Sequence, residues 1–188
     1  MKKKEELKKL LIVVDMVNGF IKEGNMADPS INHITPGIVK LIEEKTDDTQ
    51  VVFIKDTHSE DSTEFEKFPV HCLKGTTESE LISELKPYEK DAFVYEKNST
   101  CALYAKNFLS DLDSMKKLRE IILTGCCSDI CVLNLAIALV NYLDEQNKNI
   151  KVSVYKELIE TYHSREHNRE EYNQMSLKLM KQAGIEIR

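Results

Sequence analysis

Glycine and proline are scarce in this chain, with six and four residues respectively among 188. Unfolded chains and collagen-like helices are rich in one or both, so the composition excludes these classes. Apolar residues make up 41% and charged residues 31% of the chain, which is typical of a globular protein. The length suffices to bury a sizeable core, and we expect a single domain over residues 1–188.

Long apolar runs are also absent. The basic run Lys2–Lys4 is followed by Glu5 and Glu6 and then by a short strand-like segment. We therefore expect a solvated tip, and neither a signal peptide nor a membrane span. The net charge of −6 argues against nucleic acid and anionic membranes as partners. Without a secretory signal, the five cysteines are expected to be reduced thiols in a cytoplasmic protein.

Short segments rich in valine and isoleucine alternate with helix-like segments along the whole chain. The former predict strands covered on both faces, at residues 10–14, 51–54, 92–95, 121–123, 150–155 and 185–187. The latter predict helices at 36–45, 129–143 and 168–183, the second of them buried. In the third, helical spacing predicts core positions for Tyr172, Met175, Leu179 and Met180. The alternation predicts an α/β fold in three layers around a mostly parallel sheet.

The chain has no serine nucleophile elbow, no phosphate-binding glycine loop and no dinucleotide fingerprint. Reactive side chains instead follow four predicted strands, namely Asp15, Asp56, Lys97 and the cysteines of segment 126–131. Because ligands of open parallel sheets bind beyond the carboxyl ends of the strands, we expect these groups to meet in one site.

Cys131 falls in the first turn of the helix that Ser128 or Asp129 is expected to cap. Unpaired N–H groups there can lower the pKa of a thiol and can hold an oxyanion. Asp15 would serve as its proton acceptor, and Lys97 would keep Asp15 ionised. These parts suit acyl transfer through a thioester. From its position alone, however, Cys131 is equally well a small buried apolar residue.

The polar segment 56–90 is too long for an ordinary connection, which favours a functional loop. It contains Asp56, His58, Glu64 and His71, and the first two project to the same side of an extended chain. Two histidines with one or two carboxylates suit Zn²⁺, Fe²⁺ or Mn²⁺. Cys72 is a weaker alternative ligand.

The order of these residues resembles the nicotinamidase branch of the isochorismatase-like cysteine hydrolases. The resemblance is carried by Asp15, Asp56-x-His58, Glu64, Pro69-x-His71-Cys-Leu-x-Gly75-Thr76, Lys97 and Gly125-x-x-Ser-Asp-Ile-Cys131-Val. It implies a Rossmann-like, six-stranded sheet with helices on both faces, and a catalytic triad of Asp15, Lys97 and Cys131. It also implies a metal held by Asp56, His58 and His71, with Glu64 in the place of an additional acidic ligand.

The same resemblance implies further features of the site. The backbone N–H groups of Cys127 and Cys131 would form the oxyanion hole, after a cis peptide at Cys126–Cys127. Phe20 and Phe68 would form aromatic walls of the substrate pocket. The chain departs from the family pattern at Val17, Gly19, Thr100-Cys101-Ala102-Leu103, Cys126-Cys127 and Lys156-Glu157. These departures affect the pocket more than the reactive groups.

The implied activity is metal-assisted hydrolysis of nicotinamide to nicotinate and ammonia through a thioester, in NAD salvage, with zinc ahead of iron or manganese. One alternative is a related cysteine hydrolase that acts on another small amide or carbamoyl substrate. A non-enzymatic alternative is a structural zinc or thiol redox-sensing module built on the clustered cysteines. A homo-oligomer formed through Val140, Tyr142 and Leu143 also stays open.

Overall fold

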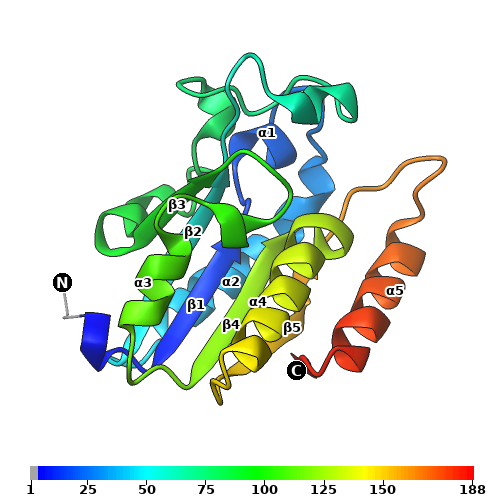
Figure 1. Cartoon of the computed structure of the whole chain (residues 1–188). Coiled ribbons are helices and arrows are strands. Elements are labelled where there is room, and N and C mark those ends of the chain that lie inside the picture. The colour runs from blue at the N-terminus through cyan, green and yellow to red at the C-terminus, as the bar shows by residue number, and fades with distance from the viewer. Residues whose placement is uncertain (1–3) are drawn as a thin grey trace.

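The computed structural model describes residues 4–188, and its centre is a six-stranded sheet in which all neighbouring strands run parallel (Figure 1). The strand order is β3-β2-β1-β4-β5-β6. The bounds are β1 Lys9–Val14, β2 Thr49–Asp56, β3 Phe93–Lys97, β4 Glu120–Cys126, β5 Lys151–Glu160 and β6 Glu186–Ile187. All six predicted strands are confirmed, and the α/β class is correct.

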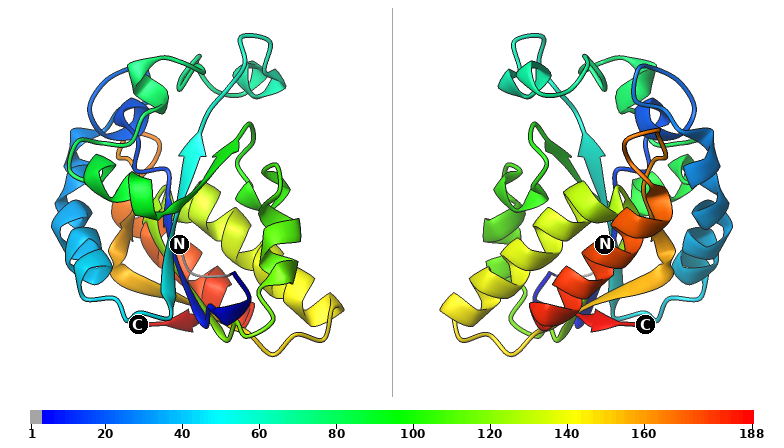
Figure 2. Two further views of the ribbon diagram at one scale, coloured as in Figure 1. Left: turned by 90° about the vertical axis from the view of Figure 1, so that its left-hand side faces the viewer. Right: turned by 90° about the vertical axis from the view of Figure 1, so that its right-hand side faces the viewer.

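Helices cover both faces of this sheet, which gives the three predicted layers. They are α1 Asn18–Ile21, α2 Thr35–Glu43, α3 Phe108–Ser114, α4 Leu133–Glu145 and α5 Arg169–Gln182. Figure 2 shows α2 on one side of the sheet and α3 and α4 on the other. Alternate residues of β1 accordingly enter different cores, with Ile12 and Val14 beneath α3 and α4 and Leu11 and Val13 beneath α2.

The helix predictions need three corrections. Met175 and Leu179 are 45% and 43% exposed, and of the four predicted core side chains in α5 only Met180 is fully buried. The face that meets the sheet is the one that carries Ser176 and Met180, about a quarter turn away. The predicted helix 129–143 is α4 preceded by a π-helical turn at Ser128–Val132, and it is buried on one face only. The short helices α1 and α3 were not predicted.

The polar segment between β2 and β3 contains only short 3-10 turns, at Thr63–Glu66, Thr77–Ser79 and Lys86–Asp91. It lies over the carboxyl end of the sheet, at the top of Figure 1. Within residues 4–188, no helix combines the length and the apolar character that crossing a membrane requires. The predicted basic tip at Lys2 and Lys3 lies outside the described residues.

Candidate active site

A buried lysine joins the ends of three strands. Lys97, the last residue of β3, places its Nζ 2.9 Å from Oδ2 of Asp15, and it also contacts Oδ1 of Asp56 at the end of β2. All three residues are at most 2% exposed. Burial disfavours the ammonium form, but the charges of Asp15 and Asp56 outweigh it and hold the pKa of Lys97 well above its usual range. A cation between two carboxylates is thereby fixed in the interior.

Asp15 follows β1 in a left-handed backbone conformation, with φ at 52°. Next to it, Gly125 has φ of 104°, and a Cβ at this position would lie 2.1 Å from the carbonyl oxygen of Val14. Only glycine lets β4 approach β1 so closely. Desolvation, opposed by Lys97 and aided by Asp56, raises the pKa of Asp15 to about 6. Apart from its ion pair with Lys97, the carboxylate of Asp15 lies beside the Cys131 thiol, from which it can accept a proton.

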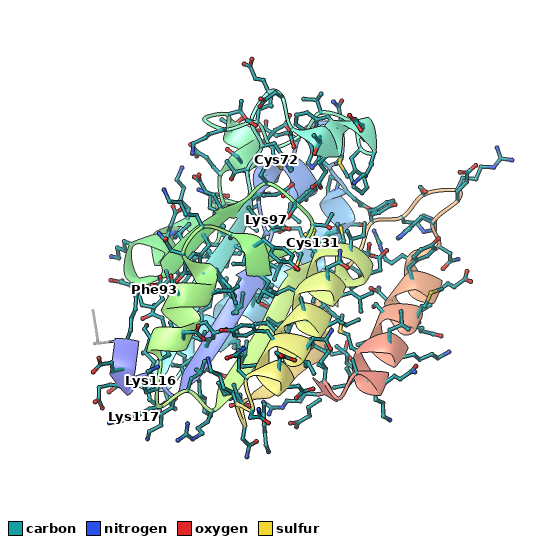
Figure 3. The ribbon with its side chains drawn as sticks, in the orientation of Figure 1. Cys72, Phe93, Lys97, Lys116, Lys117 and Cys131 are labelled. Carbon is teal, nitrogen blue, oxygen red and sulfur yellow. The ribbon has the colours of Figure 1, made fainter. Side chains whose placement is uncertain are left out.

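Cys131 lies in the π-helical turn Ser128–Val132 that follows β4. The carbonyl oxygen of Cys127 accepts hydrogen bonds from the N–H groups of Ile130 and Val132, at 3.2 and 3.0 Å. The prediction that Ser128 or Asp129 caps the helix is wrong, because Cys127 occupies the cap position and no side chain bonds there. The peptide Cys126–Cys127 is cis, as the resemblance implies. Figure 3 shows Cys131 and Lys97 at the same end of the sheet.

The expected stabilisation of a Cys131 thiolate is not found. Burial raises the pKa of the Cys131 thiol well above its usual range. The positive charge of Lys97 lowers this pKa only in part, and the negative charges of Asp15 and Asp56 raise it further. The thiol lies beside the Asp15 carboxylate and favours its ionised form. This arrangement sets a thiol whose pKa is raised beside a carboxylate that can act as its base.

Asp56, His58 and His71 bring one possible ligand atom each to within 4.8 Å of one another, and all three are buried. The Nε2 atoms of His58 and His71 lie 2.8 and 3.0 Å from Oδ2 of Asp56. The opposite ring atoms are also bonded, His58 Nδ1 to Asn98 Oδ1 at 2.8 Å and His71 Nδ1 to the Pro69 carbonyl at 2.6 Å. Such outer contacts direct Nε2 of a metal-binding histidine inward, so this donor set fits a divalent ion.

Glu64 lies apart from this group of ligand atoms. It lines the cavity onto which Asp56 and His71 open, but the described donors that converge are only Asp56, His58 and His71. No cysteine belongs to that group, which removes the support for a zinc site built on the clustered thiols. The negative charge of Asp56 also acts on His58: burial lowers its pKa, but the hydrogen bond and the charge of Asp56 outweigh this and raise it.

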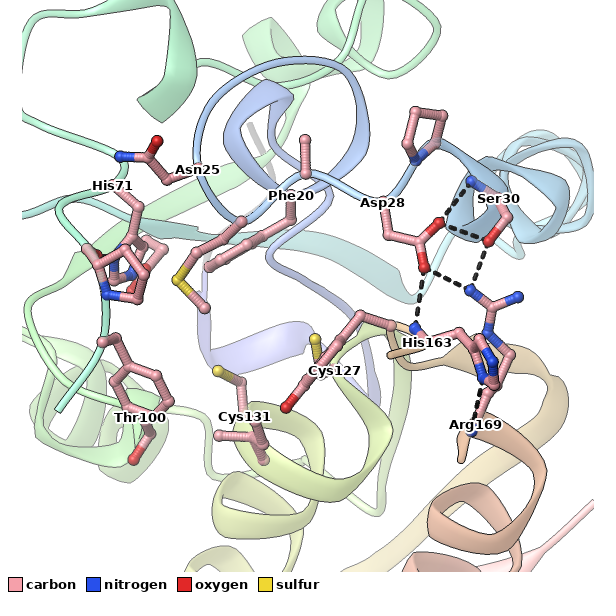
Figure 4. A pocket seen from close by; sticks show the side chains of 18 of the residues that line it. Phe20, Asn25, Asp28, Ser30, His71, Thr100, Cys127, Cys131, His163 and Arg169 are labelled. Atoms are coloured by element: carbon pink, nitrogen blue, oxygen red, sulfur yellow. Dashed lines mark hydrogen bonds and ion pairs between the residues drawn. The ribbon is translucent and has the colours of Figure 1, made fainter. Parts of the chain in front are cut away.

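Cys131, Asp56 and His71 line a cavity of about 700 Å³. Figure 4 shows His71 on one side of Cys131, and Asp28, Ser30 and Arg169 on the other. Phe20 and Phe68 both line the cavity, with ring centroids 5.6 and 6.4 Å from that of His71. A flat ring held between these aromatic groups would place a substituent near Cys131.

Several lining residues were not predicted. Arg169 bonds to Asp28 at 2.6 Å and thereby joins α5 to a segment 141 residues earlier in the chain. His163 and Tyr162, which precede α5, complete that side of the cavity. No local pattern in the sequence marks such a distant pair. Asn98, which contacts His58, was also not predicted, although it directly follows the predicted Lys97 in the sequence.

Comparison with known proteins gives a consistent picture. The family model described as the isochorismatase domain matches residues 9–187. Nicotinamidase 1 of Arabidopsis thaliana is 32% identical over 142 residues, which is 66% of this chain and 57% of that protein. The crystal structure of nicotinamidase PncA from Bacillus subtilis is 26% identical, has a TM-score of 0.76, and aligns with 96% of this chain and 99% of that one.

A third comparison concerns a structure that holds a metal. The pyrazinamidase of Pyrococcus horikoshii in complex with zinc has a TM-score of 0.75 at 22% identity, with 96% of this chain and 98% of that one covered. At this identity the similarity shows the fold. Fold and site together define a hydrolase of the three-layer α/β class. The chain belongs to the isochorismatase family, and the predicted resemblance to its nicotinamidase branch is confirmed.

Proposed function

We propose that this protein hydrolyses the carboxamide of nicotinamide to nicotinate and ammonia, with Cys131 as nucleophile. The observation that carries the proposal is the convergence of two sets of groups on one cavity. Cys131, beside the Asp15–Lys97 pair, lines the same cavity as Asp56 and His71, two members of the converging group that His58 completes. The similarity to Arabidopsis nicotinamidase 1 supports the choice of substrate. Release of nicotinate would place the enzyme in NAD salvage. We also propose a location in the cytoplasm.

In the first half-reaction, Asp15 accepts the thiol proton as Sγ of Cys131 attacks the carboxamide carbon. The N–H groups of Cys127 and Cys131 are assigned to the oxyanion that develops on the carbonyl oxygen. Lys97 offsets the negative charge that Asp15 and Cys131 share before attack. The tetrahedral species then expels ammonia, which takes its proton from Asp15, and an acyl thioester remains on Cys131.

In the second half-reaction, Asp15 is again a carboxylate and removes a proton from a water molecule. The water oxygen attacks the thioester carbonyl, and the same two N–H groups hold the oxyanion. Collapse releases nicotinic acid, which loses its proton to solvent to give nicotinate, and the proton on Asp15 returns to Sγ. The buried carboxylate therefore acts as base and acid in turn, a role that suits a pKa between those of an ordinary aspartate and an ordinary histidine.

Asp56, His58 and His71 would hold the metal, with zinc as the first choice and iron or manganese as alternatives. When bound, the ion would supply a Lewis acid for a nitrogen-containing ring. Phe20 and Phe68 hold the faces of that ring in place. Glu64 is close enough to act on the charge of the site through His58.

The direct test is release of ammonia from nicotinamide and pyrazinamide by protein loaded with zinc. We expect turnover of both, since each has a ring nitrogen near its carboxamide. If neither compound is hydrolysed but another small amide is, in a reaction that requires Cys131, the protein is a cysteine hydrolase with a different substrate. Absence of hydrolysis on a panel of amides would refute the proposal.

Replacement of a histidine ligand is expected to remove the metal. In His58→Ala and His71→Ala, zinc affinity should fall by a factor of about 100 or more, because two remaining donors hold the ion poorly. Glu64→Ala should change affinity by a factor of about 10 or less, since Glu64 lies outside the converging group. Equilibrium dialysis with metal analysis measures this, with His33→Ala, whose side chain is 60% exposed, as control. Full occupancy in both ligand variants would exclude the assignment.

Acid is expected to inactivate the enzyme through Asp15. The base form of Asp15 is required, and its pKa is raised to about 6. The value of kcat/KM should therefore be constant at neutral pH and fall by about tenfold per pH unit below pH 6. The profile is measured at saturating zinc, with bound metal determined at each pH, so that proton competition at the histidines is separated. A flat profile down to about pH 4.5 with full occupancy would contradict a base of this pKa.

A further inference from the structure

The turn that carries Cys131 is held from outside by the segment between β5 and the middle of α5. This segment, residues 160–173, contacts two consecutive side chains of the turn, Ser128 and Asp129. We infer that His167 and Asn173 are positioning residues, which fix the turn so that Sγ of Cys131 and the N–H groups of the oxyanion hole are aligned with Asp15. The inference rests on the proposed function, because its principal measurement is amide hydrolysis.

The first contact is a buried pair of His167 and Asp129. Nε2 of His167 lies 2.8 Å from Oδ2 of Asp129, and Nδ1 lies 3.0 Å from the carbonyl oxygen of Tyr162. One ring nitrogen of His167 thus contacts the turn and the other contacts its own segment. Oδ1 of Asp129 is buried without a hydrogen-bond partner among the described residues. The contact with His167 is therefore the one that fixes the Asp129 side chain.

Two tyrosine rings fix the plane of the His167 ring. Tyr162 stacks on one side with a centroid separation of 3.9 Å and an interplanar angle of 13°. Tyr172 stacks on the imidazole at 3.7 Å and 26°. Stacked aromatic rings attract one another, and His167 is only 6% exposed. The stacked rings leave the imidazole little freedom to turn away from Asp129.

The second contact runs through Asn173. The hydroxyl of Ser128 donates to Oδ1 of Asn173 at 2.5 Å, and Nδ2 of Asn173 donates to Oε1 of Glu160 at 2.5 Å. Glu160 ends β5 and is paired in register with Cys126 of β4. The contact is thus anchored on the sheet beside the start of the turn, and α5 lies next to this turn (Figure 1).

These contacts matter because a π-helical turn is not a stable element by itself. Such turns are rare, and they occur mostly at functional sites where neighbouring structure maintains them. Ser128 and Asp129 immediately precede Ile130 and Cys131, so a shift of their side chains moves the nucleophile directly. Misplacement of a reacting group by about 1 Å can cost about 100-fold in rate. Neither His167 nor Asn173 is among the residues that line the cavity. They are therefore positioning residues and not catalytic ones.

The test compares His167→Phe with Asp129→Asn in the zinc-loaded enzyme. Phenylalanine keeps a ring between the two tyrosines but loses both hydrogen bonds, and asparagine keeps the shape of Asp129. In each variant we expect kcat per folded site to fall by about 10- to 100-fold with KM within about threefold of wild type. Modification of Cys131 by iodoacetamide, which does not depend on amidase activity, should slow by about fivefold or more because Asp15 is misaligned.

Two comparisons separate positioning from a general loss of structure. Tyr104→Phe, which changes a ring that is 76% exposed, is the control and is expected to leave kcat unchanged. The double variant Asp129→Asn with His167→Phe should lose no more than the worse single variant, because both act through one contact. Wild-type values of kcat and alkylation rate in both single variants would overturn the inference, as would a rise in KM alone. If wild type itself fails to hydrolyse amides, the proposed function fails, and the alkylation rates still decide the positioning role.

Discussion

Cys131→Ala is expected to abolish amide hydrolysis, with kcat lowered by a factor of about 10⁴ or more. The nucleophile forms the covalent intermediate, and no other group in the cavity has both a thiol and Asp15 beside it. Zinc binding should be unchanged, since the ligand atoms come from Asp56, His58 and His71. Ammonia release and metal content of the same preparation measure both quantities.

The matched control for this variant is Cys101→Ala. Cys101 is a half-buried free thiol, and it is not among the residues that line the cavity. Its activity should stay within about twofold of wild type, as for most substitutions away from the reacting groups. Loss of metal from Cys131→Ala, with little loss of activity in metal-supplemented buffer, would contradict the role of Cys131 as nucleophile.

Lys97→Met is expected to damage both stability and activity. The substitution leaves Asp15 and Asp56 buried near each other without their shared cation. Breaking a buried ion pair on one side costs about 3–5 kcal/mol, so the free energy of unfolding should fall by that amount. Hydrolysis should fall by a factor of about 10³, because the Lys97 ammonium no longer stabilises the ionised form of Asp15 and the negative charge of Asp56 disfavours it. Denaturant unfolding without metal, and ammonia release with metal, measure the two effects.

The pH dependence of this variant gives a further check. Protonation of Asp15 and Asp56 relieves the unpaired charges, so the deficit relative to wild type should shrink as the pH falls. Lys55→Met is the control, because Lys55 pairs with Glu89 at 3.3 Å and its side chain is 15% exposed. A partly exposed pair of this kind contributes up to about 1 kcal/mol. Equal destabilisation by the two substitutions would show that the position of Lys97 between two carboxylates has no special role.

The sheet and the reactive residues at its carboxyl edge were accessible from sequence because both depend on local patterns. Runs of valine and isoleucine mark buried parallel strands, and the residue after each run must lie at the edge where the strands end. Asp15, Asp56 and Lys97 follow this rule directly. In the same way, the spacing of Asp56 and His58 identified two of the three side chains whose possible ligand atoms converge.

Features that depend on packing between distant segments were not accessible. Spacing along α5 does not say which face meets the sheet, so Met175 and Leu179 were wrongly placed in the core. The pKa of Cys131 is set by burial and by charges from other strands, and these reverse the effect expected from a helix terminus. The contact of His167 with Asp129 joins residues 38 apart, and a histidine in a polar loop gives no sign of its partner.

A thioester on Cys131 can be detected by rapid acid quenching during turnover of nicotinamide, followed by mass spectrometry of the digested protein. We expect a pyridine-carbonyl adduct on Cys131, absent from Cys131→Ala and strongly reduced in Asp15→Asn. Steady ammonia release without an adduct at any quench time, in conditions where hydrolysis of the thioester is made rate-limiting, would contradict it. So would an adduct carried by Cys127, the other thiol that lines the cavity.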